Sequence, residues 1–534
     1  MTWDAAASLS FAATVLLLFA FARRRLRQTG LRHLPSPPNG SFFTGNFTQM
    51  FRFDAAQFHE HINRTYGRVI RITGVFGESR LVISDTTAVS RILVKDRHVF
   101  EEADWFLASN HRIVGPGILS TKSAQHRRQR KMLHPVFSIK HMRVLTPLFH
   151  RVARQLDAAL QEKVGDGPQE VQILDWLARL ALELIAQGGL GYSFDALNPD
   201  RGVHDFDAAL KEYMPTVSRL YFLRTLAHLI PNWPAWLLRG LAKALPIPML
   251  HKIVKISDVA HKHSVQIFEE KLTLLAQGDD PVMGEDLITV FMRENMKAPG
   301  KDRLTDEEII AQMTTLLIAA TETTSSAVAR ILHVLAHNPD AQERLRREFH
   351  DAGGGDLDYT SLHSLPYLDA VCRETLRLYP PNKFIPRVCQ ADTSIPLSKP
   401  IETSRGEVSS LYIPRGTNLL VNVAGVQHDP DIWGMDADVW KPDRFLEPFP
   451  ESVTKARIPG VYANSLVFSG GRRACIGFKF AQLEIKVALL HLVRAYRITP
   501  SKTEVVWRYG GVTTPSAKGS DGAGMEMPIV LERI

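Results

Sequence analysis

A single cysteine in a stretch rich in glycine and arginine, Cys475, has the surroundings of a metal ligand. The stretch reads FSGGRRACIGFKFAQLE over residues 468–484. Gly470 and Gly471 allow a sharp backbone turn and the close approach of a flat ligand, and Gly477 removes a side chain from the same surface. A helical pattern begins directly afterwards, and the N–H groups of a helix N-terminus favour a thiolate. A buried free thiol is the alternative, and the immediate neighbours alone do not exclude it.

The full spacing of this stretch favours the ligand over the buried thiol. Phe468, Gly471, Arg473, Cys475 and Gly477 form the pattern F-x-x-G-x-R-x-C-x-G. With this pattern the chain resembles the cytochrome P450 family of haem-thiolate monooxygenases, in which such a cysteine is the proximal ligand of the haem iron. A cysteine thiolate donates electron density to the iron and favours cleavage of the O–O bond. The resemblance implies that Cys475 ligates iron, that Arg473 contacts a haem propionate, and that Phe468 and Gly477 line the cofactor.

A second pattern, ETLR, carries a charged pair. Glu374 and Arg377 lie at positions i and i+3 of a helical pattern and therefore share one helix face. A surface ion pair is the alternative, but the flanking residues are apolar and predict a buried pair, whose charges must be satisfied. The resemblance implies that the pair joins the arginine of a later P-E-R-F motif. Here the chain reads PDRF, so Arg444 keeps its place while Asp443 replaces the usual glutamate. We expect a structural role for these residues.

A third pattern, AATETTS, lies in a long helical segment without proline or glycine, residues 309–335. Ala319 and Ala320 precede Thr323 by four and three positions, so they share its helix face and leave room for a cofactor and dioxygen. Glu322 and Thr323 are an acid–alcohol pair that could relay protons. Packing within a buried helix is the alternative, and the resemblance favours the catalytic role. The family commonly has glycine at the position of Ala320.

A fourth pattern is the basic run HRRQRKMLHPVF at residues 126–137. In the family, a helix with the pattern W-x-x-x-R donates hydrogen bonds to the haem propionates. Here His126 replaces the tryptophan and can still donate, and Arg130 keeps its place. Arg387 falls at another propionate-binding position of the family. The remaining basic residues of the run are Arg127, Arg128 and Lys131. They predict a patch for docking an acidic electron-donor domain, with a solvated charge run as the alternative.

The candidate substrate contacts follow from family position alone. They are Trp105, Phe106, Leu107, Leu316, Ala319, Phe384 and Ile385. These residues are apolar, which predicts a lipophilic substrate, although each aromatic among them could equally be a core residue. The region around the cysteine resembles fungal microsomal members of the family most. A terpenoid or another secondary metabolite is therefore the expected substrate class.

The composition fits a large intracellular catalytic domain. The chain has 534 residues, 45% of them hydrophobic, which is ample for a large core. Its charge is mildly positive, with 64 Lys and Arg against 56 Asp and Glu, and no basic run is interleaved with aromatics as in a nucleic-acid binder. Three cysteines exclude a disulfide framework and suggest a reducing compartment.

The N-terminal residues predict a membrane anchor. Residues 5–22 read AAASLSFAATVLLLFAFA, about the length that crosses a bilayer, and RRRLR follows at residues 23–27. Positive charge on this flank keeps that side in the cytosol. Asp4 precedes the apolar run, so no positive n-region supports the alternative of a cleaved signal peptide. We expect a single-pass anchor in the endoplasmic reticulum membrane with a cytosolic catalytic domain.

The chain is therefore divided into three parts. These are an anchor with its basic flank over residues 1–33, a Pro-rich hinge over 34–46, and a haem-binding monooxygenase domain over 47–534. The strand-like stretches are residues 68–75, 80–85 and 382–417, and residues 140–275 are mostly helical in pattern. Long helices with a small strand content predict a mainly α fold with minor β, here the cytochrome P450 fold preceded by one transmembrane helix.

One apolar region has two interpretations. Residues 213–250 contain Trp233, Trp236 and several prolines. Core helices explain most of this composition. The mixture of tryptophan, proline and arginine also suits a loop that enters the membrane interface, which we keep as a hypothesis.

The resemblance implies insertion of one oxygen atom from O2 into a lipophilic small molecule, with haem b as cofactor. Electrons would come from NADPH through NADPH–cytochrome P450 reductase, with cytochrome b5 as a second donor to test. Two alternatives are a haem-thiolate isomerase or dehydratase without net use of O2, and a membrane-anchored haem protein without catalysis. The pair Glu322 and Thr323 argues against the first alternative. The same pair and the basic helix argue against the second.

Overall fold

The computed structural model describes most of the chain. The described residues are 28–200, 204–231, 233–277, 286–462, 464–520 and 524–534. The predicted anchor, residues 5–22, lies outside them. Among the helices of the described ranges, none combines the length and apolar character needed to cross a membrane.

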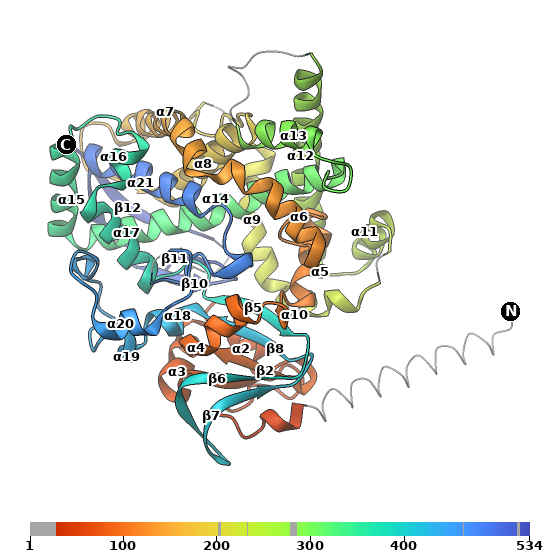
Figure 1. The fold of residues 1–534 in the computed structure, drawn as a ribbon. Helices are drawn as coiled ribbons and strands as arrows, with labels where there is room; N and C mark the ends of the chain where they lie inside the picture. Colours follow the sequence, from red (N-terminus) through yellow and green to blue (C-terminus); the bar gives the residue numbers. More distant parts are fainter. Residues whose placement is uncertain (1–27, 201–203, 232, 278–285, 463, 521–523) are drawn as a thin grey trace.

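Helices dominate the molecule, and most of the strands gather on one side of it (Figure 1). The four longest helices are α7 (Ile139–Val164), α12 (Pro248–Ala276), α14 (Asp306–Ala336) and α21 (Phe478–Ala495). Helices α5 (Asp104–Val114), α6 (Ser123–Leu133), α8 (Ile173–Leu184), α9 (Asp205–Arg219), α13 (Leu287–Lys297), α15 (Pro339–Asp351) and α17 (Pro366–Leu378) surround them. The mainly α fold with some strands is confirmed.

The remaining helices are short. They are α2 (Phe47–Phe51), α3 (Ala56–Tyr66), α4 (Thr86–Ser90), α10 (Tyr221–Leu226), α11 (Ala235–Ala244), α16 (Tyr359–His363), α18 (Val423–Gln427), α19 (Pro430–Trp433) and α20 (Glu451–Ala456). Single 3-10 or π turns complete the helical part: η1 (Gln28–Leu31), η2 (Val75–Gly77), η3 (Arg91–Lys95), η4 (Pro135–Phe137), η5 (Ile185–Leu190), η6 (Ala227–Leu229), η7 (Pro442–Phe445) and η8 (Gly471–Arg473).

A five-stranded sheet forms the main β layer, in the order β1-β2-β8-β5-β3. Its strands are β1 (Val69–Thr73), β2 (Ser79–Ile83), β3 (Phe100–Glu101), β5 (Phe384–Cys389) and β8 (Asn418–Asn422). Strands β2 and β8 run parallel, and the other neighbours are antiparallel. The expected strands at residues 68–75, 80–85 and 382–417 are present.

Three smaller sheets were not all foreseen. A hairpin joins β6 (Thr393–Thr403) to β7 (Gly406–Ile413), and a second joins β10 (Val505–Tyr509) to β11 (Thr513–Ala517). The third sheet has the order β4-β12-β9, with β4 (Gln169–Gln172), β9 (Tyr496–Pro500) and β12 (Pro528–Arg533). The sequence patterns did not predict the C-terminal strands, because β12 pairs with a strand more than 350 residues earlier.

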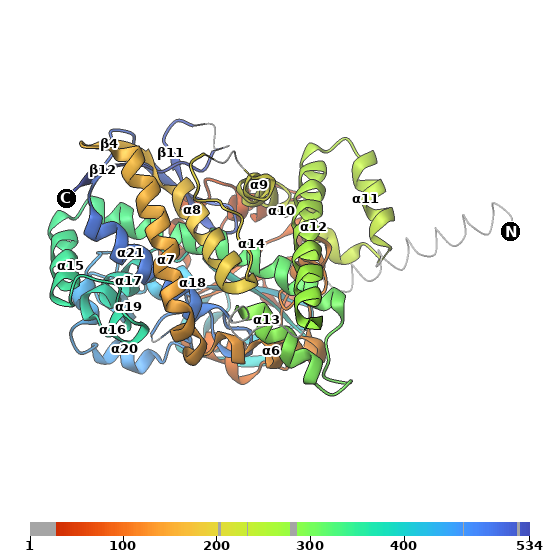
Figure 2. The ribbon, with the colours of Figure 1, turned by 90° about the horizontal axis from the view of Figure 1, so that it is seen from above.

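Helix α14 runs through the middle of the helical part and packs against α8, α12 and α21 (Figure 2). Its start is fixed by a capping box, in which the Thr305 hydroxyl accepts from the N–H of Glu308 while the Glu308 carboxylate accepts from the N–H of Thr305. Three acidic residues in its first turn complement the positive end of the helix dipole. The expected long helix over residues 309–335 is confirmed.

The Pro-rich segment of residues 34–46 lies against the domain. The carbonyl of Pro35 accepts from the N–H of Arg71 on β1 at 2.8 Å, and the amide of Asn46 donates to the carbonyl of Pro38 at 2.6 Å. Leu34 is buried. The boundaries drawn at residues 33 and 46 stay a prediction.

Candidate functional site

Cys475 sits on a tight loop between η8 and α21. Gly471 has a φ of +68°, and a Cβ there would lie 2.1 Å from the carbonyl oxygen of Leu93, so only glycine fits. The loop closes through a hydrogen bond of 2.9 Å from the N–H of Cys475 to the carbonyl of Phe468. Gly477 is the N-cap of α21, so the cysteine precedes a helix N-terminus as expected.

The Cys475 thiol is both accessible and partly desolvated by its neighbours. The residue is exposed, yet burial raises the pKa of its thiol, while the N–H of Gly477 and the Arg130 guanidinium act in the opposite direction. The helix N-terminus acts in the expected direction, because the N–H of Gly477 lowers this pKa, but burial outweighs it. The two other cysteines of the chain, Cys372 and Cys389, are buried, with pKa values raised by burial to about 12 and about 11.

One face of α14 is uncovered by protein atoms in the middle of the helix. Most residues of α14 are buried, but Ala319 is exposed, and Ala320 and Thr323 are half-buried. These are the three small residues that the sequence placed on one face. The Thr323 hydroxyl donates to the carbonyl of Ala319 at 2.8 Å. The exposed face of this helix therefore has small side chains and one hydroxyl.

The Glu322 side chain contacts α9 and makes no hydrogen bond to Thr323. Its Oε1 accepts from the N–H of Met214 on α9 at 3.4 Å, and its buried Oε2 has no partner among the described residues. Burial raises the pKa of Glu322 well above its usual range, which favours the protonated form of this side chain. Glu322 and Thr323 are both described, and no hydrogen bond joins them. The predicted relay therefore requires a bridging water or a different rotamer of Glu322.

Four basic side chains gather beside the cysteine loop. Arg130 on α6 donates to the carbonyl of Ala474 at 2.7 Å. His126, one turn earlier on the same helix, is buried. Its burial and the charges of Arg473, Arg130 and Arg387 lower its pKa to about 3, so its ring is neutral. The helix α6 and the two later arginines thus converge as the sequence predicted.

The two later arginines are held by a pair of glutamates. Arg473 donates to Glu101 Oε1 at 2.8 Å and to the carbonyl of Thr121 at 2.9 Å. Arg387 pairs with Glu102 Oε1 at 2.7 Å. Sequence reasoning missed both glutamates, since adjacent acidic residues after a short strand carry no pattern that identifies them.

This set of residues fits a haem. The donor atoms comprise one thiol, which iron accepts as thiolate, and a group of cationic side chains that suits the two propionates. The pKa of Arg130 and of Arg387 is lowered by burial and by their neighbour Arg473. Two carboxylates brought by a ligand would relieve this repulsion. The residues that would hold haem are therefore Cys475, His126, Arg130, Arg387 and Arg473.

The ETLR pair is fully buried and fully bonded. Arg377 donates to both carboxylate oxygens of Glu374, at 2.7 and 2.9 Å, and both side chains have 0% exposure. Its Nη1 donates to the carbonyls of Gln427 and Ala437 at 2.6 and 2.8 Å. Glu374 also meets Arg444 Nε at 3.4 Å. The expected contact of the pair with the later arginine is present in this structure.

Arg444 is the second arm of this network, and Asp443 stands outside it. Arg444 donates to the carbonyl of Trp433 at 2.9 Å and to Asp436 Oδ1 at 3.0 Å. Asp443, at the position of the family glutamate, instead pairs with Arg344 on the surface at 2.8 Å. The departure from the family motif therefore falls at an exposed position.

Most of the candidate substrate residues are buried, and they do not form one set. Trp105 packs edge-on to Phe106 and lies 5.6 Å from the Tyr221 ring. Phe384 packs against His59 and Tyr509. Leu107 and Leu316 are buried.

Ile385 lies on the other face of its strand. Phe384 belongs to a cluster that includes Val82, whereas Ile385 packs against a separate cluster that includes Leu81. Consecutive residues of a strand point to opposite faces, so these two cannot line the same space. Tyr221, which links Trp105 to the cluster of Phe384, was missed by sequence reasoning because it sits in an apolar run that reads as core.

Two side chains of the basic run on α6 form ion pairs within the chain. Arg128 donates to Glu308 at 2.7 Å, at the start of α14, and Lys131 pairs with Asp302 at 3.1 Å. Arg127 and Lys131 are exposed. Arg128 therefore contributes to the fold, and the docking patch foreseen from the sequence is smaller than expected.

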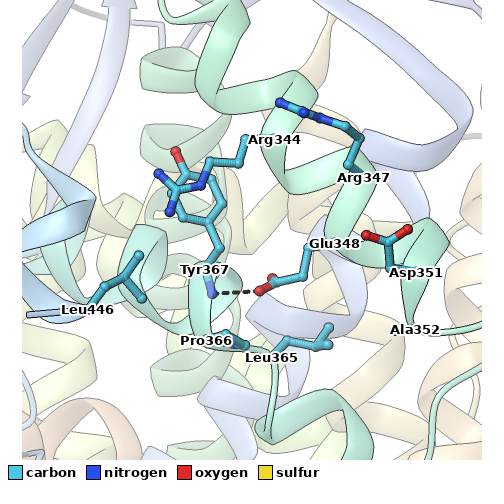
Figure 3. Close-up of a pocket in the computed structure, with 9 residues that line it drawn as sticks. All are labelled: Arg344, Arg347, Glu348, Asp351, Ala352, Leu365, Pro366, Tyr367 and Leu446. Atoms are coloured by element: carbon cyan, nitrogen blue, oxygen red, sulfur yellow. Dashed lines mark hydrogen bonds between the residues drawn. The ribbon is translucent and has the colours of Figure 1, made fainter.

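A separate cleft of about 620 Å³ opens at the surface between α15 and the start of α17 (Figure 3). Arg344 lies over the Tyr367 ring at 4.0 Å, and the N–H of Tyr367 donates to the Glu348 carboxylate at 2.7 Å. None of the candidate site residues lines this cleft.

Comparisons with known proteins agree with this geometry. The family model for cytochrome P450 matches residues 35–519. Cytochrome P450 monooxygenase 81 of Postia placenta is 41% identical over 529 residues, which cover 98% of this chain and 96% of that protein. Ganoderic acid synthetase CYP5150L8 of Ganoderma lucidum is 38% identical over 523 residues, 95% of each chain.

The match over most of the chain defines a haem-iron oxidoreductase. The chain belongs to the cytochrome P450 family and is a monooxygenase, similar to relatives from fungi.

Proposed function

We propose that this monooxygenase hydroxylates a lipophilic terpenoid of fungal secondary metabolism, with electrons from NADPH delivered by a partner reductase. The exposed thiol of Cys475 beside a cluster of arginines is the observation that carries the proposal. The relative named as a ganoderic acid synthetase supports the assignment to secondary metabolism.

Haem, when bound, supplies the site of O2 activation. The chain's own residues prepare that site. Cys475 would ligate the iron, Arg130, Arg387 and Arg473 would neutralise the propionates, and His126 would donate a hydrogen bond to them. The small residues Ala319 and Ala320 would leave room for the cofactor and dioxygen.

Thr323 holds a proton at the exposed face of α14. Its hydroxyl donates to the carbonyl of Ala319, so its oxygen lone pairs remain available to accept from a water on that face. Glu322 is the adjacent residue of the chain, and burial raises its pKa, which favours the protonated form that would supply a further proton. We assign Thr323 to positioning the proton and Glu322 to its supply through water.

Substrate binding is assigned to the aromatic cluster around Tyr221. Trp105 and Phe51 each pack against this tyrosine, Phe384 belongs to the same cluster, and burial raises the pKa of Tyr221 to about 12. An apolar, aromatic surface of this kind would favour a rigid hydrocarbon skeleton. Leu316 and Leu107 extend the apolar surface in this proposal.

The membrane side is assigned to two segments. Residues 5–22 would anchor the chain in the endoplasmic reticulum membrane, with the catalytic domain in the cytosol. The second segment surrounds α11, none of whose described residues is buried. Its exposed apolar side chains are Leu229, Ile230, Trp233, Trp236, Leu241 and Leu245. Such a patch suits the membrane interface, at the outer edge of the molecule in Figure 2.

Electron donors would dock by charge. Arg127 and Lys131 remain exposed on α6, the helix that also carries Arg130. An acidic domain of NADPH–cytochrome P450 reductase, or cytochrome b5, would meet these cations.

The test is reconstitution of the full chain with reductase and NADPH on a panel of terpenoids. The proposal expects substrate-dependent consumption of NADPH and O2 with an oxygenated product. Turnover of a substrate without NADPH consumption would instead assign an isomerase or dehydratase. Binding without any turnover across the panel would favour a non-catalytic haem protein.

Thr323→Ala is the variant that tests the proton path. We expect product per NADPH to fall by about tenfold or more, with the electrons released as hydrogen peroxide. Thr321→Ala is the matched control, because the Thr321 hydroxyl makes the same kind of bond, to Leu317 at 2.8 Å, but is buried. Equal coupling in the two variants would contradict the assigned role.

A further inference from the structure

A cluster of two histidines and an aspartate lies apart from the haem site. His150 is on α7 and His491 is on α21, in the turn before that helix ends. Asp356 comes from the loop between α15 and α16. His491 lies thirteen residues beyond the start of α21, which begins beside Cys475, so the cluster is about 20 Å along the helix from that start. No residue assigned to haem or substrate belongs to it.

Three possible ligand atoms of this cluster converge. His150 Nδ1 is 3.0 Å from His491 Nε2, and Asp356 Oδ1 is 3.7 Å from the first and 3.8 Å from the second. An ion at the centre of this triangle would be about 2 Å from each atom, which matches Zn–N and Zn–O bonds of about 2.0–2.2 Å.

Hydrogen bonds to the remaining polar atoms of His150 and Asp356 orient these two side chains. His150 Nε2 lies 2.8 Å from the carbonyl of Leu357, which can only accept, so the ring proton is on Nε2 and Nδ1 carries a lone pair. Asp356 Oδ2 is held by the Arg154 guanidinium, which leaves Oδ1 directed at the histidines. A carbonyl behind a ligating histidine and a partner behind a ligating carboxylate are typical second contacts of zinc sites.

The types of ligand atom in this cluster favour zinc over calcium and magnesium. Two imidazole nitrogens and one carboxylate oxygen suit Zn²⁺, whereas Ca²⁺ and Mg²⁺ prefer oxygen ligands only. The Asp356 side chain is 42% exposed, so the cluster opens to solvent on that side, and water can complete the coordination. Without metal, the 3.0 Å contact is a hydrogen bond from His491 Nε2–H to His150 Nδ1. Metal binding requires only that the His491 proton move to the other ring nitrogen.

We propose that His150, Asp356 and His491 form a zinc site that ties α7, α21 and the loop after α15 together. The ion would act as a structural clamp on α21, the helix that follows the cysteine ligand. It takes no part in oxygen chemistry, and the proposal does not depend on which substrate the enzyme uses.

A second cluster of the same composition offers a matched control. His204, Asp205 and His263 also lie close together, with His263 Nε2 3.0 Å from Asp205 Oδ1. There, however, His204 Nδ1 accepts from the N–H of Phe206 at 3.2 Å, so its lone pair is already used. We expect no zinc at this second cluster.

The experiment measures zinc per haem iron in the full-length holoenzyme without an affinity tag. The protein is dialysed against micromolar ZnCl2, then against buffer, and both metals are counted by mass spectrometry. We expect one zinc per haem in the wild type and in His263→Gln, and none in His491→Gln. Asp356→Asn, at an exposed position, should weaken zinc affinity by about tenfold or more. Zinc content that is equal in wild type and His491→Gln, or absent from wild type, overturns the proposal.

Thermal unfolding supplies an independent readout. Zinc that binds only the folded state raises Tm, and 100-fold excess over Kd adds about 2.7 kcal/mol of stability. We expect this rise in wild type and His263→Gln, and a rise smaller by about half or more in Asp356→Asn, whose fold does not rely on a buried histidine. A zinc-induced rise of the same size in Asp356→Asn would contradict the site.

Discussion

Glu374 on α17 and Glu322 on α14 are both buried carboxyl groups of the catalytic domain, but their surroundings differ. Glu374 is bonded by two arginines and a backbone N–H, so its charge is compensated on every side. Glu322 has one long hydrogen bond and an oxygen without a partner among the described residues. The first group is held by cationic partners as part of the scaffold, and the second is a carboxyl group whose pKa is raised by burial.

This difference distinguishes two regions of the domain, which we call the scaffold side and the reaction side. The scaffold side, which comprises the cysteine loop and the Glu374–Arg377–Arg444 network, is closed by backbone carbonyls and tight glycines. The reaction side, which comprises the exposed face of α14 and the segment around α11, has exposed small or apolar residues and a Glu322 Oε2 without a partner among the described residues.

The largest effect is expected from Cys475→Ser. Serine keeps the loop geometry, because the N–H of residue 475 makes the loop-closing bond to Phe468. We expect full loss of monooxygenase activity and of the red-shifted absorption of the reduced, carbon-monoxide-bound form, with folding retained. A retained red-shifted band with full haem loading would show that Cys475 is not the iron ligand.

Glu374→Ala should break the scaffold side. It leaves two buried guanidinium groups without their carboxylate, and removal of one partner of a buried ion pair costs about 3–5 kcal/mol. We expect little folded, haem-loaded protein. The control is Asp443→Ala, whose partner Arg344 is exposed, with an expected cost below about 1 kcal/mol. Similar losses of stability in the two variants would invalidate the distinction between network and surface.

Glu322→Gln tests the reaction side through pH. Because the folded-state pKa of Glu322 is raised, its contribution to stability is complete below the unfolded pKa and is lost as pH rises through the folded pKa. The variant cannot ionise. Its stability relative to wild type should therefore rise with pH above about 4.5, by about 1.4 kcal/mol for each pH unit until the folded pKa is reached. Tm measured for both proteins at pH 5 and pH 8 checks this, and a constant difference would place a charged carboxylate at this position.

Trp236→Phe should change stability least. The side chain is 73% exposed, so the free energy of unfolding should stay within about 0.5 kcal/mol of wild type. In nanodiscs with brominated lipids, however, the quenched fraction of tryptophan fluorescence should fall. Unchanged quenching would show that α11 does not contact the membrane, and it would contradict the membrane role proposed for its apolar patch.

The motif residues were predictable because their chemistry is encoded by local spacing. The cysteine loop, the ETLR pair and the small face of α14 each lie within one short segment, and the structure places them as expected. Arg444 could be added only through the family resemblance, because it meets Glu374 from 70 residues away.

The sequence predictions fail for residues whose surroundings are set by segments far away in the sequence. Arg128 reads as part of a docking patch, but it bonds Glu308, 180 residues later, at the start of α14. For Cys475, the helix N-terminus lowers the pKa as expected, but burial, which local sequence does not display, raises it more. Phe384 and Ile385 were assigned together although strand geometry sends them to opposite faces.

The three cysteines also provide an analytical handle. Two are buried in the core, whereas the third, Cys475, is exposed beside the residues that would hold haem. A small alkylating reagent should therefore modify one thiol per chain before cofactor loading and none afterwards. Intact-mass counting of that single adduct would report the fraction of molecules that carry haem, without any optical measurement.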